Sequence, residues 1–229
     1  MLTVAGLSVR YGSALALDLL DLAVRRDELF VLLGASGSGK TTLLRALGGF
    51  VRPDAGRIIL NGTDMTALPP HRRPINTMFQ SYALFPHLSV AANIGFGLRR
   101  RGVSRAETKQ RVAAMLALVR MEGFGPRRPA ELSGGQQQRV AVARAMVTEP
   151  ALILADEPTA NLDSASAIAL LDVMEHLNRE TGTTFIFSTH DPQVMERAHR
   201  LIRLRDGEIT RDDTRSTRET VVTVNGDAA

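Results

Sequence analysis

The stretch Gly34-Ala-Ser-Gly-Ser-Gly-Lys-Thr41 fits the phosphate-loop pattern G-x-x-x-x-G-K-[ST] at every fixed position. An apolar run at residues 29–33 leads into it, and residues 42–47 follow with the leucine spacing of a helix. A buried strand, a glycine-rich turn and a helix in this order aim successive backbone N–H groups at one point. We therefore expect this loop to bind a nucleoside triphosphate. The agreement of strand, loop and helix disfavours a glycine-rich loop that binds nothing.

The side chains of this loop suit the phosphates of ATP. Lys40 would reach the β- and γ-phosphates, and the hydroxyl of Thr41 would ligate Mg²⁺. Lys40 and Lys109 are the only lysines in a chain that otherwise uses arginine. A lysine at this position indicates that the loop requires the compact point charge of an ammonium group. The expected ATP contacts from this stretch are Gly34, Ala35, Ser36, Gly37, Ser38, Gly39, Lys40, Thr41 and Thr42.

The composition limits the possible partners. The 229 residues can bury one core with a small inserted subdomain, and 44% apolar with 23% charged residues is typical of a globular protein. The net charge of +4 comes from scattered basic residues, so we expect no nucleic-acid partner. There are no cysteines for disulfides or thiolate metal sites. With no signal-peptide pattern and no apolar run of about 20 residues, any membrane role is expected to come through partners.

The periodicity of apolar residues changes along the chain. Residues 2–10 and 14–24 alternate apolar and polar positions, which predicts two antiparallel strands beside the nucleotide core. From about residue 81 to 145 the spacing becomes helical, and Ser104 with Glu107 forms a capping box that opens a helix. This region is the expected helical insertion.

The second half of the chain repeats strand, helix and strand. Strands are expected at residues 151–155 and 183–188, with a helix at 164–178 between them, and this order indicates a parallel α/β core. We therefore predict an α/β fold: a P-loop NTPase core of RecA-like type with a mainly parallel sheet, an antiparallel β subdomain and an inserted α-helical subdomain. This single domain is predicted to span residues 1–210, followed by a loosely held polar tail at 211–229.

Titratable residues follow the two expected parallel strands. Asp156 and Glu157 end the first strand, and His190 comes just after the second. The carboxyl ends of parallel strands are where α/β sheets place ligands. Asp156 suits a Mg²⁺ role, and Glu157 is placed to orient and deprotonate the water that attacks the γ-phosphate. Two acids that merely cap a strand would leave His190, at the same expected rim, unexplained.

The stretch Leu132-Ser-Gly-Gly-Gln136, continued by residues 137–141, resembles the signature motif of ATP-binding cassette (ABC) ATPases. The resemblance covers roughly residues 2–210 and implies roles for further positions. Tyr11 matches the aromatic residue that stacks on adenine, and Gln80 matches the loop glutamine that contacts Mg²⁺ and water and couples to the membrane subunit. The other matches are Asp156 as the Walker B aspartate, Glu157 as the catalytic base, Asp163 in the dimer-interface loop 161–163, and His190 as the switch histidine.

The resemblance implies that a second copy of the chain is the first partner. In that family two subunits sandwich two ATP molecules, so Ser133, Gly134 and Gly135 of one copy would donate to the γ-phosphate held by the other. Gln136 and Asp163 are further expected ATP-binding residues. A hydroxyl and two glycines at a helix N-terminus form an anion site, and a dimer completes both sites symmetrically. The family also implies membrane permease subunits, allows for a solute-binding protein, and places the chain peripherally at the cytoplasmic face of the plasma (inner) membrane.

The branch of the family differs between the two parts of the sequence. Residues 1–150, through the stretches 69–76 and 79–90, resemble ATPases of importers for polyamines, ferric iron or similar small solutes. Residues 150–210, through the stretches 154–163 and 184–191, resemble lipoprotein-release or macrolide-export ATPases. The loop after Gln80 should contact the membrane subunit, so we favour import of a small solute such as a polyamine. Export of the second type remains the alternative.

Two further classes of protein compete with a transporter subunit. A soluble ABC ATPase of DNA repair or translation usually has long coiled coils or two cassettes in one chain, and neither pattern occurs here. A P-loop kinase or another NTPase outside the ABC family would not need the stretch 132–136. Both are therefore less favoured than a transport-coupled ATPase.

Overall fold

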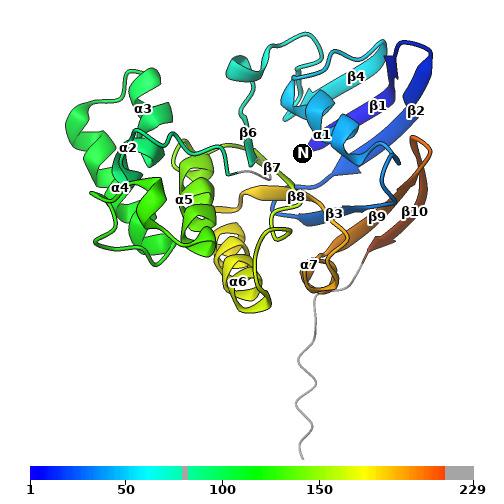
Figure 1. Ribbon diagram of the computed structural model, residues 1–229. Coiled ribbons are helices and arrows are strands. Elements are labelled where there is room, and N and C mark those ends of the chain that lie inside the picture. The colour runs from blue at the N-terminus through cyan, green and yellow to red at the C-terminus, as the bar shows by residue number, and fades with distance from the viewer. Residues whose placement is uncertain (79–81, 215–229) are drawn as a thin grey trace, which may run out of the picture.

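The central feature of the structure, a computed structural model that describes residues 1–78 and 82–214, is a six-stranded sheet (Figure 1). Its strands are, in spatial order, β10 (Glu208–Thr214), β9 (Arg200–Arg205), β3 (Leu29–Leu33), β8 (Thr184–Ser188), β7 (Leu152–Asp156) and β6 (Ile75–Met78). All neighbours are parallel except the antiparallel pair of β9 and β10. Every residue of β8 is buried, as expected where helices or a second sheet cover both faces of a parallel sheet.

The two faces of this sheet pack into two different apolar clusters. Successive residues of a strand point to opposite faces, so Val31 and Phe185 join one cluster while Phe30 and Ile186 join the other. The first cluster includes side chains of α5 (Gly134–Met146) and α6 (Ser164–Thr181), and the second includes those of α1 (Lys40–Gly48). The phosphate-loop helix therefore lies on the opposite face from the helix that follows the signature turn.

A second, antiparallel sheet covers the α1 face. It consists of β2 (Ala14–Val24), β1 (Leu2–Tyr11), β4 (Ala55–Leu60) and β5 (Thr63–Asp64), in that order. The β1–β2 pair has the alternating burial that the sequence predicted, and β4 turns into β5 at Asn61 and Gly62. Its inward residues, such as Val4 and Leu22, belong to the same cluster as Leu43 of α1. This sheet is the predicted antiparallel β subdomain.

The helices α2 (Val90–Ile94), α3 (Phe96–Arg100) and α4 (Arg105–Leu118) lie together on one side of the molecule, away from the antiparallel sheet (Figure 1). With α5 they occupy most of the region predicted as the helical insertion. Ser104 accepts a hydrogen bond from the backbone N–H of Glu107 at 3.2 Å and so caps α4, as the sequence indicated. The remaining elements are the 3-10 turns η1 (Pro70–Arg72) and η2 (Pro129–Glu131), and helix α7 (Pro192–Arg197). The fold class predicted from the sequence is confirmed.

The end of the chain differs from the prediction of a tail from residue 211. Strand β10 continues to Thr214, because its residues pair with β9 and because Arg200 holds Asp212 with two side-chain bonds, from Nε at 2.7 Å and from Nη2 at 2.5 Å. Residues 215–229 lie outside the described part, so the prediction for them stays a prediction. Within residues 1–78 and 82–214, no helix has the length and apolar character to cross a membrane.

Candidate nucleotide-binding site

The phosphate loop leaves the carboxyl end of β3 and enters α1. Gly34, Gly37 and Gly39 have φ angles of 156°, 84° and 105°, the left-handed region that favours glycine. A Cβ at Gly34 would come within 2.4 Å of the carbonyl oxygen of Leu204, and one at Gly39 within 2.8 Å of that of Ala16. The loop is therefore held against backbone on two sides, and a side chain at Gly34 or Gly39 would move it.

Two polar side chains of the loop have no hydrogen-bond partner among the described residues outside the loop. The ammonium of Lys40 donates to the carbonyl oxygens of Gly34 at 2.7 Å and Ala35 at 2.9 Å, so its charge points back over the turn. The buried hydroxyl of Ser38 has no hydrogen-bond partner among the described residues. A cation over a glycine-rich turn at a helix N-terminus, with a buried unpaired hydroxyl, fits a bound polyphosphate.

The strand β2 borders the loop, and its hairpin partner carries the predicted adenine-stacking residue. Ala16 and Leu17 of β2 lie against Gly39, and Tyr11, at the end of β1, pairs with Ala14 in the same hairpin. The side chain of Tyr11 is 48% exposed, so its ring is open to an incoming base. Thr41 is exposed and Thr42 is half-buried at the start of α1. The stacking role of Tyr11 stays a prediction.

The acidic pair and the histidine meet at the carboxyl edge of the parallel sheet. Asp156 is in register with Ser188, which is in register with Leu32 of β3, so all three strands end beside the phosphate loop. One oxygen of Glu157, Oε1, lies 3.0 Å from Nδ1 of His190. Glu157 has a φ of 49°, and its backbone N–H donates to the carbonyl oxygen of Ser188 at 2.8 Å. The structure thus joins the predicted base and the predicted switch residue in one contact.

Three residues that the sequence analysis did not assign hold this pair. The hydroxyl of Thr189, which is fully buried, donates to Oε2 of Glu157 at 3.2 Å and accepts from the backbone N–H of Asp191 at 3.1 Å. The hydroxyl of Thr159 donates to Oδ2 of Asp191 at 2.7 Å. Thr189 and Asp191 are the direct sequence neighbours of His190. This adjacency is the one feature of the sequence from which their role could have been predicted.

The signature turn is built as a helix cap. The Ser133 hydroxyl accepts from the backbone N–H of Gln136 at 3.3 Å, and the Gln136 side-chain oxygen accepts from the backbone N–H of Ser133 at 3.0 Å, which makes a reciprocal capping box at the start of α5. Gly134 is exposed, and a Cβ at Gly135 would come within 3.1 Å of the Ser166 hydroxyl oxygen. The turn therefore packs on the start of α6 and leaves an exposed helix N-terminus.

The start of α6 is capped by the predicted interface residue Asp163. Its carboxylate accepts from the Ser166 backbone N–H at 2.9 Å and from the Ser166 hydroxyl at 2.7 Å, and these bonds lower the pKa of Asp163. Gln80 lies outside the described residues. The segment just after it is held by Arg144 of α5, which donates to the carbonyl oxygens of Tyr82 at 2.9 Å and Ala83 at 2.6 Å.

The donors available for Mg²⁺ are oxygens, as this hard cation prefers. Thr41 at the loop and Asp156 at the end of β7 present a hydroxyl and a carboxylate at the same edge of the sheet. Across residues 1–78 and 82–214 there is no group of three or more His, Cys, Asp or Glu residues able to hold a metal ion by themselves. The arrangement fits a cation that takes its other ligands from phosphate oxygens and water, the usual way in which Mg²⁺ is bound.

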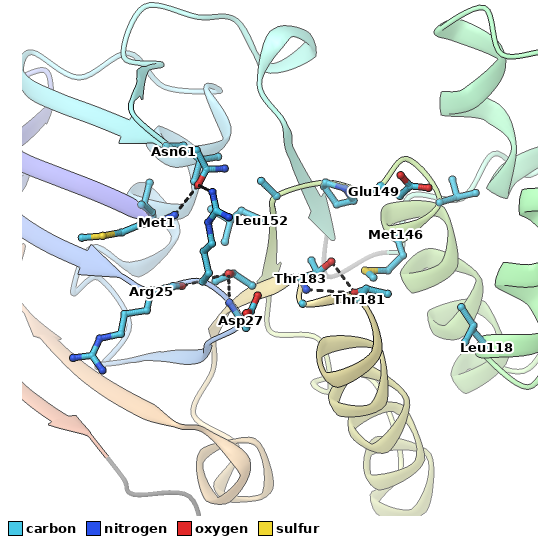
Figure 2. A pocket seen from close by; sticks show the side chains of 18 of the residues that line it. Met1, Arg25, Asp27, Asn61, Leu118, Met146, Glu149, Leu152, Thr181 and Thr183 are labelled. Atoms are coloured by element: carbon cyan, nitrogen blue, oxygen red, sulfur yellow. Dashed lines mark hydrogen bonds between the residues drawn. The ribbon is translucent and has the colours of Figure 1, made fainter.

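A cleft of about 740 Å³ lies elsewhere on the described surface (Figure 2). Met1 and Asn61 border it on one side, Leu118 and Met146 on the other, and Leu152 opens β7 at its edge. Because Leu152 begins a strand whose last residue is Asp156, the cleft is at the amino edge of the sheet, opposite the phosphate loop. It is not part of the nucleotide site.

The fold and the site define a P-loop NTPase cassette in which the N-terminus of α5 is exposed at the capped turn of Ser133. Residues 17–160 match the family model described as ABC transporter, and the chain belongs to this family. The chain is 54% identical over 182 residues to the spermidine/putrescine import ATP-binding protein PotA of Mesorhizobium japonicum. The aligned region covers 80% of this chain and 50% of that protein. It is 44% identical over 218 residues to the protein of the same name from Pseudomonas aeruginosa, and that alignment covers 95% of this chain and 60% of the relative.

A solved structure shows the same fold. The dimeric post-hydrolysis state of the ATP-binding cassette MJ0796, bound to ADP and Pi, superposes with a TM-score of 0.82 at 31% identity, over 95% of this chain and 100% of that one. The chain spans about half the length of the curated relatives that it matches.

Proposed function

We propose that this chain is the ATP-hydrolysing subunit of an ABC transporter that imports a polyamine. The observation that carries ATP hydrolysis is the convergence of the phosphate loop, Asp156 and the Glu157–His190 contact at one edge of the parallel sheet. The loop and Lys40 would bind the phosphates of ATP. Glu157 would accept the proton of the attacking water, and His190 would fix the carboxylate and contact the γ-phosphate.

Mg²⁺, when bound with ATP, neutralises the charge that develops on the phosphates in phosphoryl transfer. Thr41 and Asp156 would hold it directly or through water, and we retain Gln80 as its third predicted contact. The backbone N–H groups at the start of α1 would bind the β- and γ-phosphate oxygens. Together these groups provide electrostatic stabilisation and positioning, which is what phosphoryl transfer requires from a protein.

We infer that two copies act together. The capped turn at Ser133 exposes a helix N-terminus of a 13-residue helix, and that N-terminus suits a phosphate oxygen. A symmetric dimer would place the turn of one copy over the ATP of the other and so complete two equal sites. The dimeric arrangement of the structural neighbour bound to ADP and Pi supports this proposal.

The names of the relatives support polyamine import as the transport activity. The Pseudomonas aeruginosa relative matches 95% of the chain, so the similarity to a polyamine importer includes the region 150–210 for which export was the alternative. The subunit would work beneath permease subunits, peripherally at the cytoplasmic face of the inner membrane, with a solute-binding protein delivering the solute.

Two measurements test this proposal. Purified chain with ATP and Mg²⁺ should release phosphate, and Glu157→Gln should abolish release while ATP still binds; wild-type turnover in that variant would contradict the assignment of the base. Tagged Glu157→Gln should also co-purify from ATP-treated native membranes with a multi-span permease, and proteoliposomes of the same complex assembled with the wild-type chain should take up labelled spermidine. A permease with few spans and a large external domain would favour export instead.

A further inference from the structure

Gln138 on α5 is a buried polar residue that lies within the signature stretch but to which the sequence analysis assigned no role. Its side chain is 1% exposed, and its Nε2 donates to the carbonyl oxygen of Pro158 at 2.7 Å. Its Oε1 is buried and has no hydrogen-bond partner among the described residues. An unpaired buried amide oxygen costs roughly 1–3 kcal/mol, whereas a methionine of similar shape would fill the same space without that cost. We therefore expect the amide of Gln138 to have a role that depends on its hydrogen bond to Pro158.

The acceptor of this bond is next to the predicted catalytic base. Pro158 follows Glu157, whose φ of 49° is a strained conformation for a residue with a side chain. Such a conformation persists only where the surroundings fix it from several sides. On one side the backbone N–H of Glu157 is bound by Ser188; on the other, the next carbonyl is bound by Gln138.

The donor of this bond is on the helix that begins at the signature turn. Gln138 comes five residues after Ser133, a distance of roughly 7.5 Å along a helix. A helix transmits a displacement of its first turn to its second almost rigidly. A contact between Ser133 and a phosphate held by another copy would therefore displace Gln138. Through the hydrogen bond of Gln138 it would also displace the carbonyl of Pro158.

The loop beyond Pro158 leads back to the carboxylate. Thr159 donates to Asp191, the backbone N–H of Asp191 donates to Thr189, and Thr189 donates to Oε2 of Glu157. A shift of the Pro158 carbonyl would therefore move both the backbone and the side-chain support of Glu157. Because each of these bonds is buried or half-buried, they reinforce one another more than exposed bonds would.

We propose that Gln138 is a positioning residue that sets the geometry of Glu157 in response to the signature turn, through its hydrogen bond to the Pro158 carbonyl. The inference rests on the ATP hydrolysis proposed above. It assigns to Gln138 no contact with ATP or water. Its effect is expected on the rate of the chemical step rather than on the binding of nucleotide to the phosphate loop.

The test compares Gln138→Met with the wild-type chain. Methionine keeps the volume and removes the donor, so kcat for phosphate release should fall about tenfold, the effect of losing one buried hydrogen bond in the catalytic state. The dissociation constant for ATP, by isothermal titration calorimetry, and the ATP-driven dimerisation measured in the Glu157→Gln background should stay within twofold. Gln110→Met, an exposed change of the same kind on α4, is the control and should keep the wild-type kcat.

Hydrogen exchange of backbone amides provides a second readout, and Gln138→Asn provides a second variant. Amides of residues 159–163 should exchange faster in Gln138→Met, while those of the phosphate loop stay as in the wild type. If the methionine variant does not fold, Gln138→Asn, which withdraws the amide by one methylene and stays polar, should show the same loss of kcat.

A wild-type chain without ATP hydrolysis would refute the proposed function itself. An active wild type with an unchanged kcat in the folded variant would overturn only the role of Gln138. A parallel loss of kcat, ATP affinity and melting temperature would show a structural role instead and would also overturn it.

Discussion

Arg73 provides a demanding test of how the phosphate-loop helix is held. This arginine is only 4% exposed, and its guanidinium donates to the carbonyl oxygens of Ala46 at 2.8 Å and Leu47 at 2.7 Å, in the last turn of α1. It also donates to Leu68 at 2.8 Å. A positive charge at the C-terminus of a helix satisfies carbonyls that have no partner within the helix and opposes the negative end of the helix dipole. Burial lowers the pKa of Arg73.

The expected cost of Arg73→Met follows from these bonds. The Ala46 carbonyl keeps a bond from the backbone N–H of Gly49 at 3.1 Å. The carbonyls of Leu47, Leu68 and Thr66, the last of which accepts from Nη2 of Arg73 at 3.3 Å, lose this donor. Three carbonyls that lose this donor, one buried and two part-buried, cost roughly 1–3 kcal/mol each at most, and methionine avoids the desolvation of a guanidinium, so the net loss is about 3 kcal/mol. For a chain of this size that corresponds to a fall in melting temperature of roughly 6–12 °C.

The assay is urea unfolding of the full chain followed by circular dichroism, with Arg72→Met as a matched control. Arg72 is the adjacent arginine and is exposed, so its substitution should change the free energy of unfolding by no more than about 0.5 kcal/mol. A loss below about 1 kcal/mol in Arg73→Met, or an equal loss in both variants, would show that the buried arginine does not hold α1 and would refute this reasoning.

Two further predictions concern ATP binding and the end of the chain. Lys40→Ala should weaken ATP binding roughly 10- to 100-fold, the value of one charge-assisted contact, and equal affinities by isothermal titration calorimetry would refute the role of the loop. Bonds from Arg200 lower the pKa of Asp212, so its stabilising contribution is complete above the unfolded pKa of about 3.9 and is lost as the pH falls through the lower folded value. Asp212→Asn should therefore be less stable than the wild type at pH 7 and should approach it below about pH 4. Parallel urea midpoints for the two chains from pH 7 to pH 3 would contradict the pairing with Arg200.

The parts of the site that depend on adjacent residues could be predicted from the sequence. The phosphate loop is such a case, because a strand, three glycines and a helix follow one another directly between Leu29 and Gly48. The approach of Glu157 to His190 could also be predicted, since both follow strands that the α/β pattern makes parallel neighbours. The sequence pattern predicts the order of the parallel strands, and that order places Glu157 beside His190.

The supporting contacts could not be predicted, because they join residues far apart in the chain. The bond from Thr159 to Asp191 spans 32 residues and that from Gln138 to Pro158 spans 20, so neither follows from a local pattern. The extension of β10 was missed for a related reason. Its residues 211–213 are charged and exposed or half-buried, so they lack the apolar alternation of a strand and are ordered by pairing with β9 and by Arg200.

The mass of the Glu157→Gln variant in solution tests the central claim most directly, because the account requires ATP to join two copies. Light scattering after size exclusion should give twice the chain mass of 24.8 kDa with ATP and Mg²⁺, and 24.8 kDa with ADP. Adding Ser133→Arg, which places a long charged side chain at the signature turn, should restore the single-chain mass while ATP still binds. A single-chain mass for Glu157→Gln under saturating ATP, with binding shown by calorimetry, would contradict the ATP-sandwich dimer.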